Sequence, residues 1–396
     1  MDDSQLPLDG YRVVAFEVAA AGPFATQMLA DMGAEVIKIE RPGTGDTIRQ
    51  WDEAVRGLSS GYVWLNRNKR SVTVDVKTDA GREVVRRLVA RSDVFVENFA
   101  PGVAEAAGLG YGSLSERHPA LVYCSISGYG QDGPYRDRKA FDLLIQGEAG
   151  IISTTGYPDR PAKASVPLAD IAAGMYASNA IVMALLQRER GGTGQYIDIS
   201  MFDSMLSWLA YFPHHYWHQG ELPQRVGMRH HYVTPYGPFL AGDGRYVNFA
   251  VASARDWEVF CKVVLERPDL LADERFATVI GRRTHREELE AEVERLFGEH
   301  DSAFWFDRLE QAKLAFGEVR DIDEVLAHPQ TAARGMVREV DSPVGRVRVI
   351  ANPIRTTASE PRDGPVPSLG GDTDDVLRET GYSAEEIARL HEEGAV

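Results

Sequence analysis

Short apolar runs alternate with amphipathic segments in the first half of the chain. The runs favour strands, because they are rich in valine, isoleucine and aromatic residues, and they occupy residues 11–17, 34–40, 72–75, 94–96, 121–126 and 195–200. Between them, residues 24–32 and 80–92 carry apolar side chains at helical spacing, and Gly33 ends the first of these helices. Residues 18–23 predict a bend. This alternation indicates a mostly parallel sheet flanked by helices, with right-handed crossovers.

The chain first continues this α/β domain and then, from about residue 225, predicts a second domain inserted into it. Residues 169–187 form a long, largely apolar helix that should be buried, and residues 202–220 are aromatic-rich with a helical pattern. From about residue 225 the pattern changes to a hairpin at 237–251 followed by helical segments. We therefore expect a large α/β domain with a Rossmann-like parallel sheet and a smaller α+β domain. The boundaries are 1–224 for the first part, 225–335 for the small domain and 336–396 for a C-terminal return to the large domain.

Composition and charge narrow the class of protein. The chain has 396 residues, of which 44% are hydrophobic, and its formal net charge is −16. A nucleic-acid surface would need a basic patch, so we expect no nucleic-acid partner. Cys124 and Cys261 are the only cysteines and have no metal-ligand spacing, so neither a disulfide framework nor a metal site is predicted. No signal-like N-terminus and no uninterrupted apolar run of membrane length occur, so a cytoplasmic protein without a membrane partner is expected.

Asp170 is the sharpest candidate for catalysis. It lies at the start of the apolar helix predicted at 169–187. One interpretation is an N-cap, because aspartate satisfies free N–H groups at a helix start. The other is a nucleophile, because a carboxylate at the N-terminus of a buried helix is desolvated yet supported by the helix dipole. The residues alone leave both open.

Other polar residues give weaker signals. Gly22 and Pro23 stand where a dinucleotide fold would carry three glycines, so nicotinamide binding is not supported. Arg41 follows the strand at 34–40, where it could be a solvated cation or a contact to a nucleotide phosphate. The histidines near residues 214–218 and 230–231 fit aromatic packing, and none has a metal-binding spacing.

Eight ordered runs resemble those of the class III CoA-transferase family, which also contains formyl-CoA transferases and α-methylacyl-CoA racemases. They are AGPFATQMLADMGAEVIKIERPGTGD (21–46), LNRNKRSVTVDVKT (65–78), VENFAPG (96–102), GYGQDGPYRDRKAFD (128–142), ADIAAGMYA (169–177), GQYIDISMFDS (194–204), HPQTAARGM (328–336) and SLGGDTDDVLRETGYS (368–383). The resemblance spans the chain and implies an interlocked homodimer.

The resemblance also implies a set of functional residues. Asp170 would be the nucleophile that forms an aspartyl mixed anhydride and then an aspartyl-CoA thioester. CoA and acyl-CoA would be substrates, with no permanently bound cofactor. The positions matching the family's CoA contacts are Ala19, Ala20, Ala21, Arg41, Val74, Asp75, Val76, Lys77, Asn98, Phe99, Ala100 and Lys139.

The chain departs at three places from the sequence patterns of the formyl-CoA transferases and the racemases. Ala106 replaces an arginine of the formyl-CoA transferases, and their glycine-rich lid has no counterpart after Tyr232. Phe141 replaces the histidine of the racemases, and because it cannot move a proton the racemase alternative is weakened. A non-catalytic CoA-binding protein is a third alternative, against which Asp170 argues.

The substrates are expected to be short branched dicarboxylates. The chain most resembles the family branch that acts on mesaconate, citramalate or itaconate. A second carboxylate needs a cation or donor in the pocket. The local candidates are Arg225, Arg229, His230 and His231.

Overall fold

The computed structural model describes residues 6–396, and the chain divides into two compact units. The first unit comprises residues 6–151, Ala164–Ala210 and Pro329–Val396, and the second comprises Ile152–Lys163 and Tyr211–His328. Compared with the expected small domain at 225–335, the second unit begins earlier, at Tyr211, and takes in a separate hairpin segment before Asp170. The C-terminal segment returns to the first unit.

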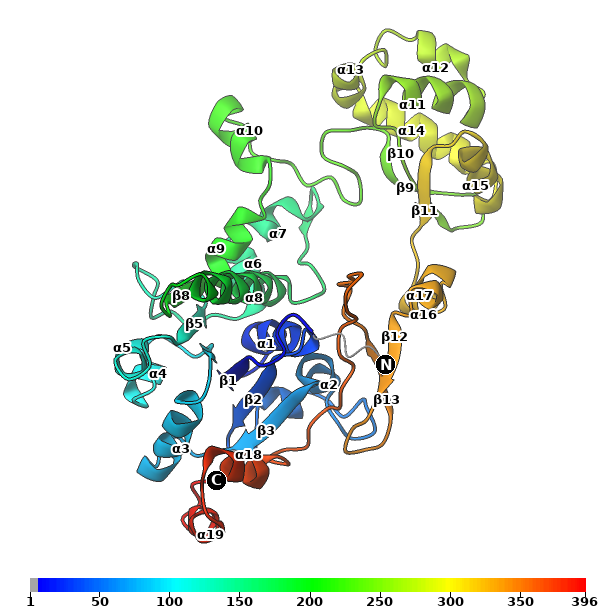
Figure 1. Ribbon diagram of the computed structural model, residues 1–396. Coiled ribbons are helices and arrows are strands. Elements are labelled where there is room, and N and C mark those ends of the chain that lie inside the picture. Colours follow the sequence, from blue (N-terminus) through cyan, green and yellow to red (C-terminus); the bar gives the residue numbers. More distant parts are fainter. Residues whose placement is uncertain (1–5) are drawn as a thin grey trace. The chain divides into compact units, whose positions relative to one another are not determined.

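A six-stranded parallel sheet organises the first unit (Figure 1). Its strands, in spatial order, are β3 (Lys69–Thr73), β2 (Glu35–Glu40), β1 (Arg12–Phe16), β4 (Val94–Glu97), β5 (Val122–Ser127) and β8 (Tyr196–Ser200). This is the strand order of a Rossmann-type sheet. The first three strands are added in one direction from β1, and the next three are added in the opposite direction from β4, so the strand order reverses between β1 and β4. The predicted parallel α/β architecture is confirmed.

Both faces of this sheet are covered by apolar side chains. Along β1, Val13 and Ala15 pack on one side, whereas Val14 and Phe16 pack on the other. Strands that are buried on both faces read as continuous apolar runs, which is why they could be located from the sequence. The first face is covered mainly by α1 (Ala21–Asp31) and α8 (Leu168–Glu189), and the second by α3 (Asp79–Val89), α18 (Thr373–Thr380) and α19 (Ala384–Glu392) (Figure 1).

Helix α8 is the central helix of the first face. By length and composition it is apolar enough to cross a membrane, although no uninterrupted apolar run suggested this. Its small residues instead pack into the core against α1, and Gly174 marks the closest approach. A Cβ atom at Gly174 would lie 2.8 Å from the carbonyl oxygen of Ala21, so the two helices could not pack this closely around any larger residue.

The start of α1 differs from the prediction. The helix begins at Ala21, so Gly22 and Pro23 lie in its first turn instead of in a bend. Proline is tolerated there because the N–H groups of the first turn have no partner within the helix. The bend is confined to the preceding residues, where Ala19 has a φ of 60°.

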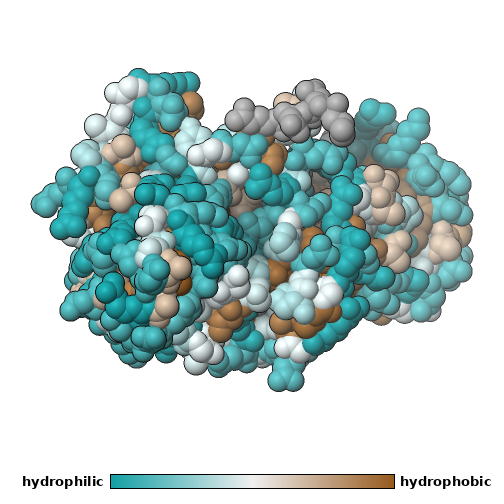
Figure 2. All heavy atoms as spheres, turned by 60° about the horizontal axis from the view of Figure 1, so that its bottom comes forward, coloured by the Kyte–Doolittle hydropathy of each residue, from teal (hydrophilic) through white to brown (hydrophobic). Residues whose placement is uncertain are grey.

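Smaller elements complete the first unit. They are η1 (Thr47–Gln50), α2 (Ser60–Asn66), α4 (Val103–Ala106), α5 (Tyr111–Ser115), α6 (Asp142–Glu148), α9 (Met201–Ser207), α17 (Pro329–Ala333), β12 (Val337–Val340) and β13 (Val347–Ile350). The hairpin β12–β13 packs on α2 and η1 through Val340, Val347 and Val349. The space-filling view shows a mainly hydrophilic face with separate hydrophobic patches, in keeping with the high net charge (Figure 2).

The second unit is built on an antiparallel sheet of order β11-β10-β9. The expected hairpin is β9 (Tyr236–Leu240) and β10 (Tyr246–Ala250), and β11 (Ala315–Glu318) adds the third strand. The other elements are β6 (Gly156–Tyr157), β7 (Arg160–Pro161), α10 (Phe212–Gln219), α11 (Ala254–Val259), η2 (Phe260–Val264), α12 (Pro268–Ala272), α13 (Val279–Thr284), α14 (Arg286–Phe297), α15 (Ser302–Gln311) and α16 (Ile322–Leu326). Helix α7 (Ile151–Thr154) crosses the boundary.

Candidate active site

Asp170 is the third residue of α8 and not its N-cap. The cap position belongs to Pro167, which has no side-chain capping bond. The free N–H of Ala169 is instead bound by Asp142, the first residue of α6, at 2.7 Å. Gln146 holds that carboxylate in place by donating to its other oxygen, also at 2.7 Å. The N-cap interpretation of Asp170 is therefore wrong, because a residue from another helix performs that task.

The surroundings of Asp170 disfavour its charge. In residues 6–396 its side chain has no cationic partner and no hydrogen bond, although it keeps some contact with solvent. Burial is the larger cause, and the like charge of Asp142 is the second; together they raise the pKa of Asp170 from 3.8 to about 7. An unpartnered carboxyl that ionises near neutral pH is a group available for chemistry.

A cavity of about 760 Å³ opens at the carboxyl ends of β1, β2, β3 and β4. This is the point where the strand order reverses, which is where open α/β sheets bind ligands. Among the expected CoA contacts, the structure places Arg41, Val74, Asp75, Val76, Lys77 and Phe99 in its lining. Ala106 also lines it, so the arginine it replaces would have projected into this space.

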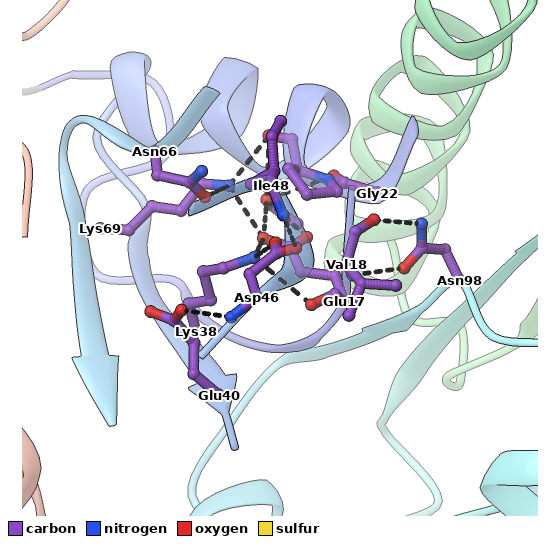
Figure 3. A network of polar contacts seen from close by, with 12 residues as sticks. Glu17, Val18, Gly22, Lys38, Glu40, Asp46, Ile48, Asn66, Lys69 and Asn98 are labelled. Atoms are coloured by element: carbon purple, nitrogen blue, oxygen red, sulfur yellow. Dashed lines mark hydrogen bonds and ion pairs between the residues drawn. The ribbon is translucent and has the colours of Figure 1, made fainter. Parts of the chain in front are cut away.

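The remaining expected CoA contacts lie outside the lining of that cavity. Ala20 and Ala21 are buried at the start of α1, whereas Ala100 and Lys139 are exposed on loops. Asn98 instead binds Val18, a residue of the cavity lining. It donates to the carbonyl of Val18 and accepts its N–H, both at 2.8 Å, and so ties the loop after β4 to the loop after β1 (Figure 3). Ala19 belongs to the loop after β1, and it donates its N–H to Asp46 at 3.0 Å.

A buried network of charges supports the floor of the cavity (Figure 3). Glu17 accepts from Lys69 at 2.8 Å and lies 3.4 Å from Lys38, which pairs with Asp46 at 2.9 Å. Burial lowers the pKa of Lys69 to about 8, while Glu17 opposes this shift. Because each buried charge has a partner, the network can exist in the interior and hold the loops rigid.

A second pairing neutralises the acid at the end of β2. Arg49 binds both oxygens of Glu40 at 2.8 Å, and Ser71 donates to the same carboxylate at 2.7 Å. These donors outweigh burial and lower the pKa of Glu40 to about 2. Glu17, Glu40 and Asp46 are thus paired with cations, while Arg41, Lys77 and Asp75 in the same lining have no ion pair with any described residue. The exposed positive charge of the cavity suits a phosphate-bearing ligand.

Among the polar residues in or beside the cavity, Gln50, Arg82 and Glu97 were not predicted as functional. Gln50 and Arg82 line it, and Arg82 belongs to an amphipathic helix whose pattern indicates only a solvated cation. Glu97 ends β4, accepts the N–H of Phe99 at 3.0 Å and binds Ser125. Burial raises the pKa of Glu97 to about 7. The sequence signal that could have identified Glu97 is an acidic residue at the end of an apolar strand.

The residues expected to bind a second carboxylate lie in the other unit, and most already form hydrogen bonds or ion pairs within the protein. Arg225 donates to the carbonyls of Tyr157 at 2.9 Å and Pro158 at 2.7 Å. Arg229 pairs with Glu294 at 2.7 Å. The Nδ1 atom of His230 accepts two backbone N–H groups. For His231, no described residue forms a hydrogen bond with its buried Nε2 atom. No cluster of three possible metal ligands occurs within residues 6–396.

The strand order, the cavity at the reversal point and the isolated carboxyl define an α/β enzyme of the doubly wound class. The model of CoA-transferase family III matches residues 8–373. The chain therefore belongs to CoA-transferase family III, and it is a CoA-transferase.

Relatives of known name agree with this assignment. The succinyl-CoA:glutarate CoA-transferase of Homo sapiens is 35% identical over 98% of this chain and 90% of its own length. The succinyl-CoA:mesaconate CoA-transferase of Haloarcula hispanica is 36% identical over 90% of this chain and 92% of its own. The crystal structure of a CAIB/BAIF family protein from Brucella suis superposes with a TM-score of 0.83, at 38% identity over 95% of this chain and 100% of that chain.

Proposed function

We propose that this enzyme transfers CoA between short dicarboxylic acids and that Asp170 is the nucleophile. The observation that carries the proposal is the Asp170 carboxyl, which lacks a structural partner among the described residues and has a pKa of about 7. A carboxylate that is only weakly stabilised by its surroundings attacks more readily than one held in an ion pair. The named substrates of the relatives, glutarate and mesaconate, support the choice of diacids.

The reaction follows from a carboxylate attacking a thioester. The Asp170 oxygen adds to the acyl carbon, the carbon–sulfur bond breaks, and CoA leaves as a thiolate. The thiolate attacks the aspartyl carbon of the resulting anhydride and releases the donor acid, leaving an aspartyl-CoA thioester. The acceptor carboxylate then displaces the thiolate, which attacks the acceptor's acyl carbon and frees Asp170. No proton, electron or water is consumed.

The cavity lined by Arg41 and Lys77 would hold CoA in this scheme. Its two exposed cations lack acidic partners among residues 6–396, and they stand at the carboxyl edge of the sheet. The residues Ala19–Ala21, Asn98, Ala100 and Lys139 remain proposed contacts. Phe141 is 71% exposed at the start of α6 and has no titratable proton, which supports transfer over racemisation.

We also propose a cytoplasmic, interlocked homodimer. Helix α8 buries half of its length in the core, yet Val182, Met183 and Leu186 remain exposed on it, and Leu143 and Leu144 on α6. Exposed apolar side chains gathered on one helix, as on α8, favour an interface. Met183→Glu should weaken a dimer, whereas Ile280→Glu, a matched change at an equally exposed residue of the second unit, should not. A folded, active wild-type monomer in sedimentation at low concentration would contradict the dimer.

The decisive assay combines a substrate panel with two variants. Purified protein is incubated with pairs of acyl-CoA and free acid, and products are followed by mass spectrometry. Asp170→Asn should lower turnover by a factor on the order of 10³ or more, because an amide is a poor nucleophile. Asp203→Asn is the control, since Asp203 is also the third residue of its helix. Normal turnover in Asp170→Asn would reject the proposed nucleophile.

A further inference from the structure

A short turn after β3 forms one wall of the large cavity. Residues 75–78 leave the edge of the sheet and lead into α3, and Asp75, Val76 and Lys77 line the cavity. Lys77 is one of the two cations of that lining that have no ion pair with any described residue. How this wall meets a ligand therefore depends on what holds the turn in place.

Arg82 holds the turn from the side of α3. Its Nη1 atom donates to the carbonyl of Val76 at 3.2 Å and to that of Lys77 at 2.8 Å. Its Nη2 atom forms an ion pair with Asp79, the first residue of the helix. Arg82 lines the cavity as well, but both of its terminal nitrogens bind protein groups. The guanidinium is thus bonded to the backbone of the turn, and its charge is already met by a carboxylate.

Helix α3 packs against the turn at very close range. Gly81 precedes Arg82, and a Cβ atom there would lie 2.1 Å from the carbonyl oxygen of Asp75, so the contact requires glycine. Thr78 joins the same two residues, because its hydroxyl donates to the carbonyl of Asp75 and accepts the N–H of Gly81, both at 2.9 Å. This close approach brings Arg82 within reach of two consecutive carbonyls of the turn.

The strand end before the turn is held by the C-terminal segment. Because β3 is an edge strand, its outward N–H groups need partners outside the sheet. Thr73 donates its N–H to the hydroxyl of Thr373 at 3.0 Å, and Asp75 donates its N–H to the carbonyl of Ala395 at 2.8 Å. The strand end is therefore fixed from outside, whereas the bonds from Arg82 fix the two middle carbonyls of the turn.

We propose that Arg82 is a positioning residue for the cavity, and that it favours CoA binding by fixing the turn at 75–78 and not by contacting a phosphate. A wall that is already ordered lowers the entropy lost when a ligand binds. The proposal rests on the assignment of this cavity to CoA. Arg82→Lys separates the two roles, since lysine keeps the charge but lacks the planar fork of donors.

The first test uses the full chain and measures CoA affinity by calorimetry and turnover by assay. Arg82→Gln should weaken CoA binding by about fivefold or more and leave kcat within about twofold of wild type, because the turn positions the ligand and does not react. Arg82→Lys should bind CoA nearly as weakly. Arg86→Gln is the matched control, because Arg86 also pairs with an acid three residues earlier on α3 but does not line the cavity. Wild-type affinity in Arg82→Gln or Arg82→Lys would overturn the positioning role.

Two cavity variants distinguish a failure of this proposal from a failure of the CoA assignment. If Arg41→Gln and Lys77→Gln bind CoA as tightly as wild type does, the cavity is not the CoA site and both proposals fail. If these two variants bind CoA weakly and Arg82→Gln does not, only the positioning role fails.

The second test examines the turn without any ligand. The N–H groups of Asp75, Lys77 and Thr78 are all hydrogen-bonded, so their exchange with deuterated water reports on the order of the turn. In Arg82→Gln they should exchange about fivefold faster or more, whereas Arg86→Gln should match wild type. Unchanged exchange in Arg82→Gln would show that Arg82 does not hold the turn, and it would overturn the proposal.

Discussion

Asp142 caps the helix whose third residue is Asp170, and its carboxylate also opposes the charge of Asp170. One residue thus frees the catalytic candidate from a structural task and raises its pKa. The two carboxyls come from different helices, so their relationship is a product of the fold and not of the local sequence.

This relationship predicts the pH dependence of the reaction. The nucleophile must be ionised, so turnover should rise with pH and level off above the pKa of about 7. Asp142→Asn keeps an oxygen for the N–H of Ala169 but removes the like charge. Because burial remains the larger cause, the inflection should move to lower pH without reaching 3.8. The profile of kcat/KM against pH checks this, and an unmoved inflection in Asp142→Asn would show that the two groups do not interact.

The same raised pKa values predict an unusual stability profile. Folded Asp170 and Glu97 keep their protons to about pH 7, whereas the unfolded chain releases them near the ordinary values of 3.8 and 4.5. At these two groups the folded state therefore binds more protons in this range, so their contribution to the free energy of unfolding falls as the pH rises from about 4 to 7 and then levels off.

Replacing Asp170 should accordingly stabilise the protein where it is ionised. Asp170→Asn should unfold with a free energy about 1–3 kcal/mol higher than wild type above pH 7, and similar to it near pH 4. Urea unfolding at fixed protein concentration measures this, with Asp203→Asn as the control for the substitution. A variant that is less stable than wild type at both pH values would mean that the carboxyl supports the fold.

The large cavity makes a prediction about CoA binding. Arg41 and Lys77 line it without acidic partners among the described residues. Arg41→Gln and Lys77→Gln should each raise the KM for acyl-CoA by about tenfold with little change in kcat, since a charge-assisted hydrogen bond contributes about 1.5–3 kcal/mol. Arg117→Gln, an exposed cation that does not line the cavity, is the control. A change in kcat alone would place these residues in the reaction and not in binding.

The parallel sheet could be predicted from sequence because both of its faces are buried. β1, β2 and β5 therefore appear as continuous apolar runs. The start of α1 was missed, because Gly22 and Pro23 are ordinary turn residues that a helix also tolerates in its first turn.

The candidate site was only partly predictable. Asp170 and Arg41 lie next to strong local patterns, so the sequence located them. The capping role of Asp142 depends on packing between α6 and α8, which no spacing reveals. Arg225 was an attractive cation in the sequence, but its donors are used by backbone carbonyls of the hairpin.

Direct detection of the covalent intermediate tests the central claim most directly. Wild-type protein is mixed with acyl-CoA in the absence of an acceptor acid, quenched, treated with hydroxylamine and digested. Peptide mass spectrometry should find a modified Asp170, since the activated aspartyl carbon reacts with hydroxylamine. Asp170→Asn treated in the same way should show no such product. Turnover in the wild type without any modified Asp170, or modification of a different carboxylate, would contradict the account.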